Sequence, residues 1–331
     1  MPGCQADPTI ERRVVDGFSF PLGVYPVEPL APKAGYTVAF EPADGSDSEG
    51  DWEEWPDRYV YDIVLSADRM PALFRQILML LPPRVYPILD ILGNDAFREV
   101  DPYISYELVG LDRLLDALRQ WSDFFYEDGL CGVGAMCEEP FIYAFLDEHK
   151  ILTVRVEPSM KDRVDRLLAA FDLEPCEDPA GADAAAHEHR GVLVTPDDRP
   201  ELLGPEEIIE DLRAGWRLVL NVDPDRNLDD EGNELGVTPW RCVARCEWEN
   251  PDATSTVRYA ELIVMADCLT QAELRAIEAA QGLSENEEES FDDVSFVIAD
   301  RLTPEQLAKI EKRQRRKREP SDLIRQARWL D

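Results

Sequence analysis

Apolar and polar positions of residues 58–175 follow the periods of strands and helices in turn. Alternation favours strands at 59–67 and 103–109, and at 141–146 and 151–156, where the intervening DEHK is typical of a hairpin turn. Residues 69–81 are apolar almost all round, which predicts a buried helix, and another helix is expected after Ser159. Helical spacing is clearest at 111–126, through Leu111, Leu114, Leu115, Leu118, Trp121 and Phe125. This order indicates helices layered on a mixed sheet.

A second series of elements is expected in residues 191–331. Strands are predicted at 191–195, 216–222, 240–248, 259–266 and 294–299, with a helix at 205–214. The segment 264–278, VMADCLTQAELRAIE, returns at 297–311 as VIADRLTPEQLAKIE. Thr270 with Glu273, and Thr303 with Gln306, fit a capping box, so each copy predicts a strand, a turn and a helix. The two repeated strands are expected to be parallel, with room for other strands between them.

The whole chain is therefore predicted to be α+β (mixed α/β), with two sheet-and-helix domains. Residues 1–57 are rich in proline, glycine and acid, and are expected to hold short edge strands and an acidic loop. The domains are placed at 58–175 and 191–331, and the polar segment 176–190 between them has the composition of a linker. A basic helix and a short terminal amphipathic helix after Pro320 are predicted to end the chain.

Charge narrows the choice of partners. The chain has 34 Lys and Arg against 69 Asp and Glu, a formal net charge of −35, which repels nucleic acid and anionic lipid and favours basic partners or cations. The same acidity is typical of proteins from a salt-rich host. Seven cysteines, no signal-peptide pattern and no long apolar run predict free thiols, a cytoplasmic location and no membrane segment.

One acidic loop has the ligand spacing of a calcium site. Six oxygen-bearing side chains occupy positions 1, 3, 5, 7, 9 and 12 of a calcium-loop register: Asp223, Asp225, Asn227, Asp229, Glu231 and Glu234. Leu228 stands where the turn needs glycine, and the loop is flanked by predicted strands rather than helices. It resembles an EF-hand loop only in this 12-residue pattern, and a solvated acidic loop is the alternative.

Histidine and cysteine give fewer signals. His187 and His189 form an H-x-H pair that could bind a metal, with Cys176 as a third ligand, but they lie in the polar segment where no strand is expected. His149 falls on the DEHK turn and is expected to be exposed. Cys242 and Cys246 are interpreted as core thiols of a strand, and the glycines between Cys131 and Cys137 as a tight turn.

Asp267 and Asp300 are the candidate catalytic acids. The repeat puts each carboxylate at the end of a predicted strand, where sites form in α/β proteins. The alternative is that each aspartate accepts hydrogen bonds within its own turn. No Ser-His-Asp set, nucleophile elbow or phosphate loop is visible in the sequence.

Two surface features are candidates for partner binding. Trp52 and Trp55 lie in the acidic loop, where they could anchor a partner or dock on their own chain. The segment 309–318 has a local charge of +6, and its candidate contacts are Lys312, Arg313, Arg315, Arg316, Lys317 and Arg318. Self-association, an acidic protein surface and nucleic acid are the alternatives for this basic helix.

Three functions remain open from the sequence. The first is a non-catalytic interaction module of the adaptor, inhibitor or immunity-partner type, because the charge is lopsided and no catalytic set converges. The second is a metal-assisted hydrolase using Asp267, Asp300 and the 223–234 loop, with Ca²⁺ as the candidate cofactor. The third is association with nucleic acid through the basic helix.

Overall fold

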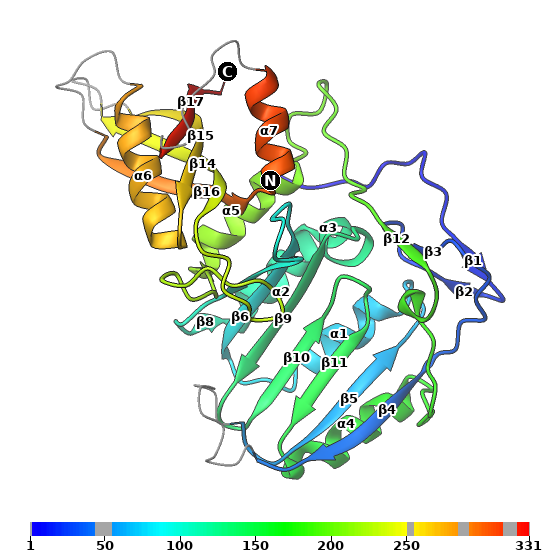
Figure 1. Cartoon of the computed structure of the whole chain (residues 1–331). Coiled ribbons are helices and arrows are strands. Elements are labelled where there is room, and N and C mark those ends of the chain that lie inside the picture. The colour runs from blue at the N-terminus through cyan, green and yellow to red at the C-terminus, as the bar shows by residue number, and fades with distance from the viewer. Residues whose placement is uncertain (1, 44–54, 250–254, 284–290, 314–322, 331) are drawn as a thin grey trace. The chain divides into compact units, whose positions relative to one another are not determined.

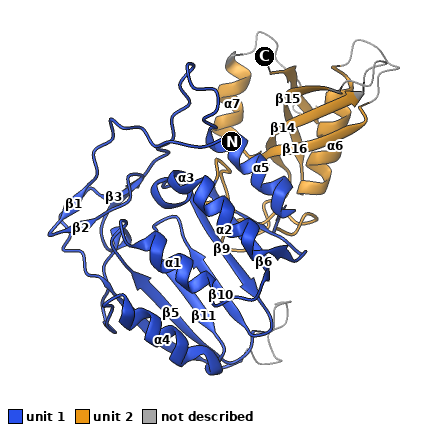
Figure 2. Cartoon of the chain, turned by 180° about the vertical axis from the view of Figure 1, so that it is seen from behind, with its two compact units in different colours: residues 1–92, 102–221 blue, residues 93–101, 222–331 orange. Residues whose placement is uncertain are grey.

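The computed structural model describes residues 2–43, 55–249, 255–283, 291–313 and 323–330. The chain divides into two compact units, which are described separately (Figure 2). Unit 1 comprises residues 1–92 and 102–221, and unit 2 comprises residues 93–101 and 222–331. Helices and sheets occur in both units, so the predicted mixed α+β fold is confirmed.

Unit 1 is built on a large sheet whose strand order is β13-β7-β6-β9-β10-β11-β5-β4, with β8 paired to β6 (Figure 1). The strands are β4 (Gly35–Glu41), β5 (Arg58–Val64), β6 (Arg84–Leu92), β7 (Val100–Ile104), β8 (Val109–Gly110), β9 (Cys131–Cys137), β10 (Ile142–Leu146), β11 (Leu152–Val156) and β13 (Val219–Leu220). The hairpin predicted at 141–156 is present as β10 and β11, which pair from Ile142↔Val156 to Leu146↔Leu152.

Helices provide the apolar layer of unit 1. They are α1 (Met70–Leu78), α2 (Leu111–Gln120), α3 (Ser122–Glu127), α4 (Lys161–Ala170), which follows the 3₁₀ turn η1 (Pro158–Met160), and α5 (Pro205–Trp216). Figure 2 shows α1, α2 and α4 in front of the same face of the sheet. The alternating pattern of β11 explains this, because Leu152, Val154 and Val156 are fully buried while the residues between them are not.

Four short strands of unit 1 form two separate two-stranded sheets. They are β1 (Val14–Val15) with β2 (Phe18–Ser19), and β3 (Val24–Pro26) with β12 (His187–His189). The segment 176–190, which the sequence suggested as a linker, thus contains β12 and the 3₁₀ turn η2 (Ala182–Ala184) and belongs to unit 1. Backbone hydrogen bonds hold it there, for example from Val27 to Ala186 (2.9 Å) and from Arg190 to Gly23 (2.9 Å). Residues 191–221 also belong to unit 1, so the units divide at 221/222.

Unit 2 has a four-stranded sheet with the order β16-β14-β15-β17. Its strands are β14 (Thr238–Glu249), β15 (Ser255–Ala266), β16 (Asp293–Arg301) and β17 (Ile324–Trp329), and its helices are α6 (Leu269–Gln281) and α7 (Pro304–Arg313). Both of the similar segments form a strand followed by a helix. Because β15 and β16 each run antiparallel to β14, they are parallel to each other and not adjacent. Alanines 272, 276, 279 and 280 are the buried face of α6.

Three local expectations were wrong. Residues 131–137 form the central strand β9 rather than a turn, since their small side chains fit between two neighbouring strands. Residues 324–329 form strand β17 rather than a helix, because the edge of β15 offers a partner from Ala260 to Val264. Residue 216 ends helix α5, which leaves only Val219–Leu220 of the strand predicted at 216–222. Among the described residues, no helix combines the length and apolar content needed to cross a bilayer.

Candidate metal centre

The chain contains three histidines, and the fold of unit 1 brings all of them together. One ring nitrogen from each of His149, His187 and His189 lies within 4.8 Å of the others. The ring centroids are 4.9, 4.7 and 5.0 Å apart, with interplanar angles of 75°, 81° and 68°. Three imidazoles edge to face around one point make a possible metal-binding cluster.

His149 is presented by the turn between β10 and β11. In this turn the backbone N–H of Lys150 donates to the carbonyl of Asp147 (3.1 Å), and the N–H of Ile151 donates to Asp147 Oδ1 (2.7 Å). Lys150 adopts a left-handed conformation with a φ of 62°, and its buried ammonium donates to the carbonyl of Cys131. These contacts fix the turn, and with it the position of the His149 backbone.

His187 and His189 are presented by β12. This strand pairs with β3 through His187↔Pro26 and His189↔Val24, and residues two apart in a strand project from the same face. Glu188 projects from the opposite face and accepts a hydrogen bond from the Tyr25 hydroxyl (2.6 Å). The H-x-H pair therefore lies on a strand, with the spacing that directs two imidazoles to one ligand.

The hydrogen bonds of the rings assign their tautomers. His187 Nδ1 lies 2.8 Å from the carbonyl oxygen of Ala185, and His189 Nδ1 lies 2.7 Å from that of Gly129. A carbonyl oxygen only accepts, so both Nδ1 atoms carry the proton and both Nε2 atoms are left with a lone pair. Backbone carbonyls at the second ring nitrogen are the usual outer partners of metal-bound histidines.

His149 completes the cluster with its own Nε2. That atom lies 3.1 Å from His187 Nε2, while His149 Nδ1 is 3.3 Å from Glu148 Oε1 and 3.7 Å from Asp147 Oδ2. With Nδ1 protonated beside these carboxylates, two lone pairs would face each other across 3.1 Å. A cation between them, either a proton or a metal ion, removes this repulsion. In a tetrahedral zinc site, nitrogen ligands are separated by about 3.3 Å.

Nearby acidic groups place negative charge around the histidine cluster. The Asp147 carboxylate, together with the charges of Glu148 and Asp183, raises the pKa of His149 against the opposing effect of burial. Burial lowers the pKa of His189, and the other two histidines lower it further. On β6, burial and the charges of Glu148 and Asp147 raise the pKa of Asp90 to about 7. These acidic side chains favour a cation at the histidine cluster.

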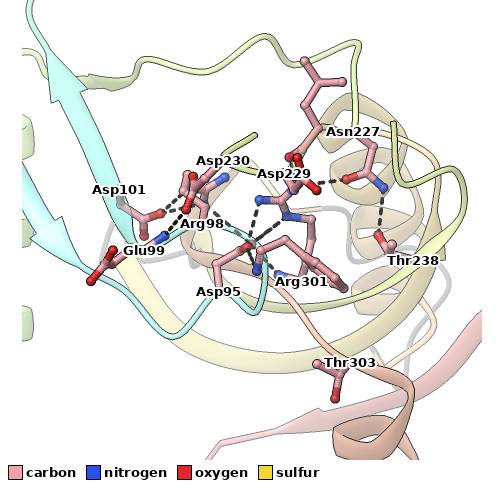
Figure 3. Close-up of polar contacts among 12 residues, drawn as sticks. Asp95, Arg98, Glu99, Asp101, Asn227, Asp229, Asp230, Thr238, Arg301 and Thr303 are labelled. Atoms are coloured by element: carbon pink, nitrogen blue, oxygen red, sulfur yellow. Dashed lines mark hydrogen bonds and ion pairs between the residues drawn. The ribbon is translucent and has the colours of Figure 1, made fainter. Parts of the chain in front are cut away.

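The six predicted calcium-loop residues each engage protein groups, and Figure 3 shows two of them, Asn227 and Asp229. Asn227 Oδ1 accepts from the Arg301 guanidinium (3.1 Å), and Glu234 pairs with Arg226 (2.7 Å). The other four loop side chains accept hydrogen bonds from nearby groups: Asp223 from the Asp225 N–H, Asp225 from Thr270, Asp229 from the Asn233 and Glu231 N–H groups, and Glu231 from Asn233. Among the described residues, the groups with metal-ligand spacing include none of this loop.

The two candidate catalytic acids differ in their surroundings. Asp267 is exposed after β15, whereas Asp300 is 5% exposed in β16, opposite Arg241 of β14. Burial, with the charges of Asp101 and Asp95, raises the pKa of Asp300 to about 6. No contact in the described part of the chain joins Asp267 to Asp300, and their catalytic role stays a prediction.

The candidate partner-binding residues are only partly within the described ranges. Trp55 packs edge to face on Phe141 and Tyr143, with ring centroids 5.3 and 5.7 Å away, so this tryptophan docks on its own unit. Lys312 is exposed near the end of α7, and Arg313 is the last residue of that helix. Outside the described residues are Trp52, Arg315, Arg316, Lys317 and Arg318.

The sequence contained half of the signal for the histidine cluster. The H-x-H spacing was visible, but β12 is three residues long and pairs with β3, more than 160 positions earlier in the chain, which no local pattern reveals. His149 was expected to be exposed, and its side chain is 22% exposed. Comparisons of the chain with family models, with curated proteins and with solved structures find no match.

Proposed function

We propose that unit 1 binds a divalent transition metal ion, with zinc as the best fit, through the Nε2 atoms of His149, His187 and His189. The observation that carries this proposal is the pair of Nε2 atoms at 3.1 Å whose partner nitrogens both face hydrogen-bond acceptors. When both rings are neutral, neither Nε2 atom carries a proton, and a metal ion accepts both lone pairs at once. The third imidazole, which faces Gly129 through Nδ1, supplies the third ligand.

Ligand chemistry favours zinc over calcium or magnesium. Imidazole nitrogen is a ligand of zinc, copper, iron and nickel, while calcium and magnesium take oxygen ligands. Three neutral ligands leave the full charge of the ion and one coordination position for solvent or a substrate atom, as in catalytic zinc sites. Metal-assisted chemistry would then belong to this centre rather than to Asp267 and Asp300. The interaction function suggested by the net charge of −35 remains a separate proposal.

The test is zinc binding by the full-length protein, measured by isothermal titration and by elemental analysis after dialysis. We expect one zinc ion per chain, and a loss of affinity on the order of 100-fold or more in H149A, H187A and H189A. The matched control is E188Q, because Glu188 lies between two of the ligands on the opposite face of β12. Its affinity should equal that of the wild type.

Two results would contradict the proposal. One is a wild-type protein that retains no zinc and shows no heat of binding. The other is binding that survives in all three histidine variants, which would place the metal elsewhere in the chain.

A further inference from the structure

We propose that the carboxylates of Glu148 and Asp147 are positioning groups for the metal centre, acting on the ion through the ring of His149. This inference depends on the proposed zinc site and assigns two residues that do not touch the ion. The ring of His149 has different neighbours at its two nitrogens: the other histidines at Nε2 and the two carboxylates at Nδ1.

The geometry assigns the two sides of the ring different roles. Glu148 Oε1 is 3.3 Å and Asp147 Oδ2 is 3.7 Å from Nδ1, whereas His187 Nε2 is 3.1 Å from Nε2. Carboxylates beside Nδ1 keep the proton on that nitrogen, which leaves the Nε2 lone pair for the metal. His187 and His189 achieve the same tautomer with backbone carbonyls. Each of the three rings thus has an acceptor at the nitrogen that faces away from the ion.

The charge of the two carboxylates is a second reason to assign them to the metal centre. Three neutral imidazoles do not reduce the charge of a divalent ion, and two adjacent carboxylates would balance it within a half-buried site. The side chains of His149, Asp147 and Glu148 are 22%, 30% and 20% exposed, so solvent screens these interactions only in part. Outer carboxylate partners of metal-bound histidines typically change metal affinity by about 10- to 100-fold when they are removed.

Glu148 is the better residue to test. Asp147 Oδ1 also accepts a hydrogen bond from the Ile151 N–H, so changing Asp147 would disturb the turn itself. The negative charge of Glu148 beside His149 can be removed by E148Q, which keeps the shape of the side chain. E188Q removes the same charge one position from two ligands, on the far face of β12, and is the matched control.

The experiment measures zinc affinity of the full-length variants by competition with a chelator. We expect E148Q to bind one zinc ion about 10- to 100-fold more weakly than the wild type, and E188Q to stay within about twofold. The second readout is the Nδ1–H signal of His149 in the NMR spectrum of the zinc-loaded protein. Removing the carboxylate should move this signal in E148Q and leave it in place in E188Q, which a loss of stability alone would not do.

The inference is overturned if E148Q binds zinc as tightly as the wild type. It is also overturned if the wild type binds a second zinc ion that E148Q loses, because the carboxylates would then be direct ligands. Both results leave the three-histidine site standing. A wild-type protein without zinc affinity would instead remove the proposed function.

Discussion

The histidine cluster of unit 1 and the acidic loop of unit 2 both gather polar side chains, but they differ in what those side chains have left to bind. In the cluster, the Nε2 atoms of His149 and His187 lie 3.1 Å apart, so the two neutral rings present their lone pairs to one shared cation. In the loop, every candidate ligand already accepts from a protein N–H, hydroxyl or guanidinium group. The difference teaches that ligand spacing in a sequence is informative only when the fold leaves the ligands unsatisfied.

In unit 2, Arg301 binds both Asp95 and the acidic loop 223–234 (Figure 3). Its guanidinium pairs with both oxygens of Asp95 and donates to Asn227 Oδ1, and the three side chains are almost completely buried. Asn227 donates in turn to Gly236 and Thr238. The guanidinium of Arg301 thus holds the loop through Asn227 Oδ1 and the Leu228 carbonyl.

The largest predicted effect tests the buried contacts of Arg301 with Asp95 and Asn227. R301M should lower the free energy of unfolding of the full chain by about 3–5 kcal/mol, because the Asp95 carboxylate, with a side chain 0% exposed, would lose its nearer cation and keep only Arg98 at 3.8 Å. Denaturant unfolding followed by tryptophan fluorescence measures the change. The matched control is R226M, which breaks the exposed pair with Glu234 and should cost about 0–1 kcal/mol. Equal losses of unfolding free energy in the two variants would refute a stabilising role of the buried Arg301–Asp95–Asn227 network.

The effect of zinc on the stability of the protein tests metal binding by the histidine cluster. Zinc at about 100 times its dissociation constant should stabilise the native protein by about 2.7 kcal/mol, because only the folded chain brings the three histidines together. Thermal unfolding with and without zinc measures the shift. H187A should lose it and R226M should keep it. An equal shift in H187A would mean that zinc acts at another place.

Neutralisation should stabilise the protein at Asp300 and have no effect at Asp267. Burial raises the pKa of Asp300 above its unfolded value, so its charged form destabilises the fold, and the penalty grows as the pH rises from about 4 to about 6. D300N should therefore stabilise the protein by about 1–3 kcal/mol at pH 7 and by little at pH 4. D267N, at an exposed position, should change nothing at either pH. A destabilised D300N at pH 7 would show that the carboxylate is needed in its charged form.

The smallest effect is expected from calcium. Binding at the 223–234 loop would require Ca²⁺ to displace Arg226 from Glu234 and the Asn233 amide from Asp229. At about 1 mM Ca²⁺ we expect a change in stability of less than about 0.5 kcal/mol. A larger shift in the wild type that E234Q abolishes would support the calcium-site prediction.

Local patterns predicted much of the fold. Apolar periodicity located the β10–β11 hairpin and helix α2, and the similar segments at 264–278 and 297–311 do form the predicted strand–helix pairs. Prediction failed where a distant partner decides the structure. Strand β17 exists because β15 has a free edge, and β9 is a strand because β6 and β10 flank it. Strand β6 lies about 40 residues before β9, and β15 lies about 60 residues before β17, so neither partner leaves a local signal.

The same limit applies to the candidate site. The H-x-H pair could be read from the sequence, but its meaning depends on His149, 38 positions earlier, and on the carbonyls of Ala185 and Gly129. The calcium-loop register was equally visible, and in it the decisive residues are Arg226 and Arg301, which lie outside the register positions. Sequence spacing therefore suggested the ligands, and only the fold distinguished free lone pairs from occupied ones.

The most direct test of the central claim follows the three histidines themselves. Because the chain has no other histidine, the ring nitrogens of ¹⁵N-histidine-labelled protein give a spectrum of the site alone. Titration with zinc should shift the Nε2 signals of His149, His187 and His189 together and reach saturation at one zinc ion per chain, with the Nδ1 protons retained. Signals that do not move, or that move for only one or two rings, would contradict a three-histidine metal centre.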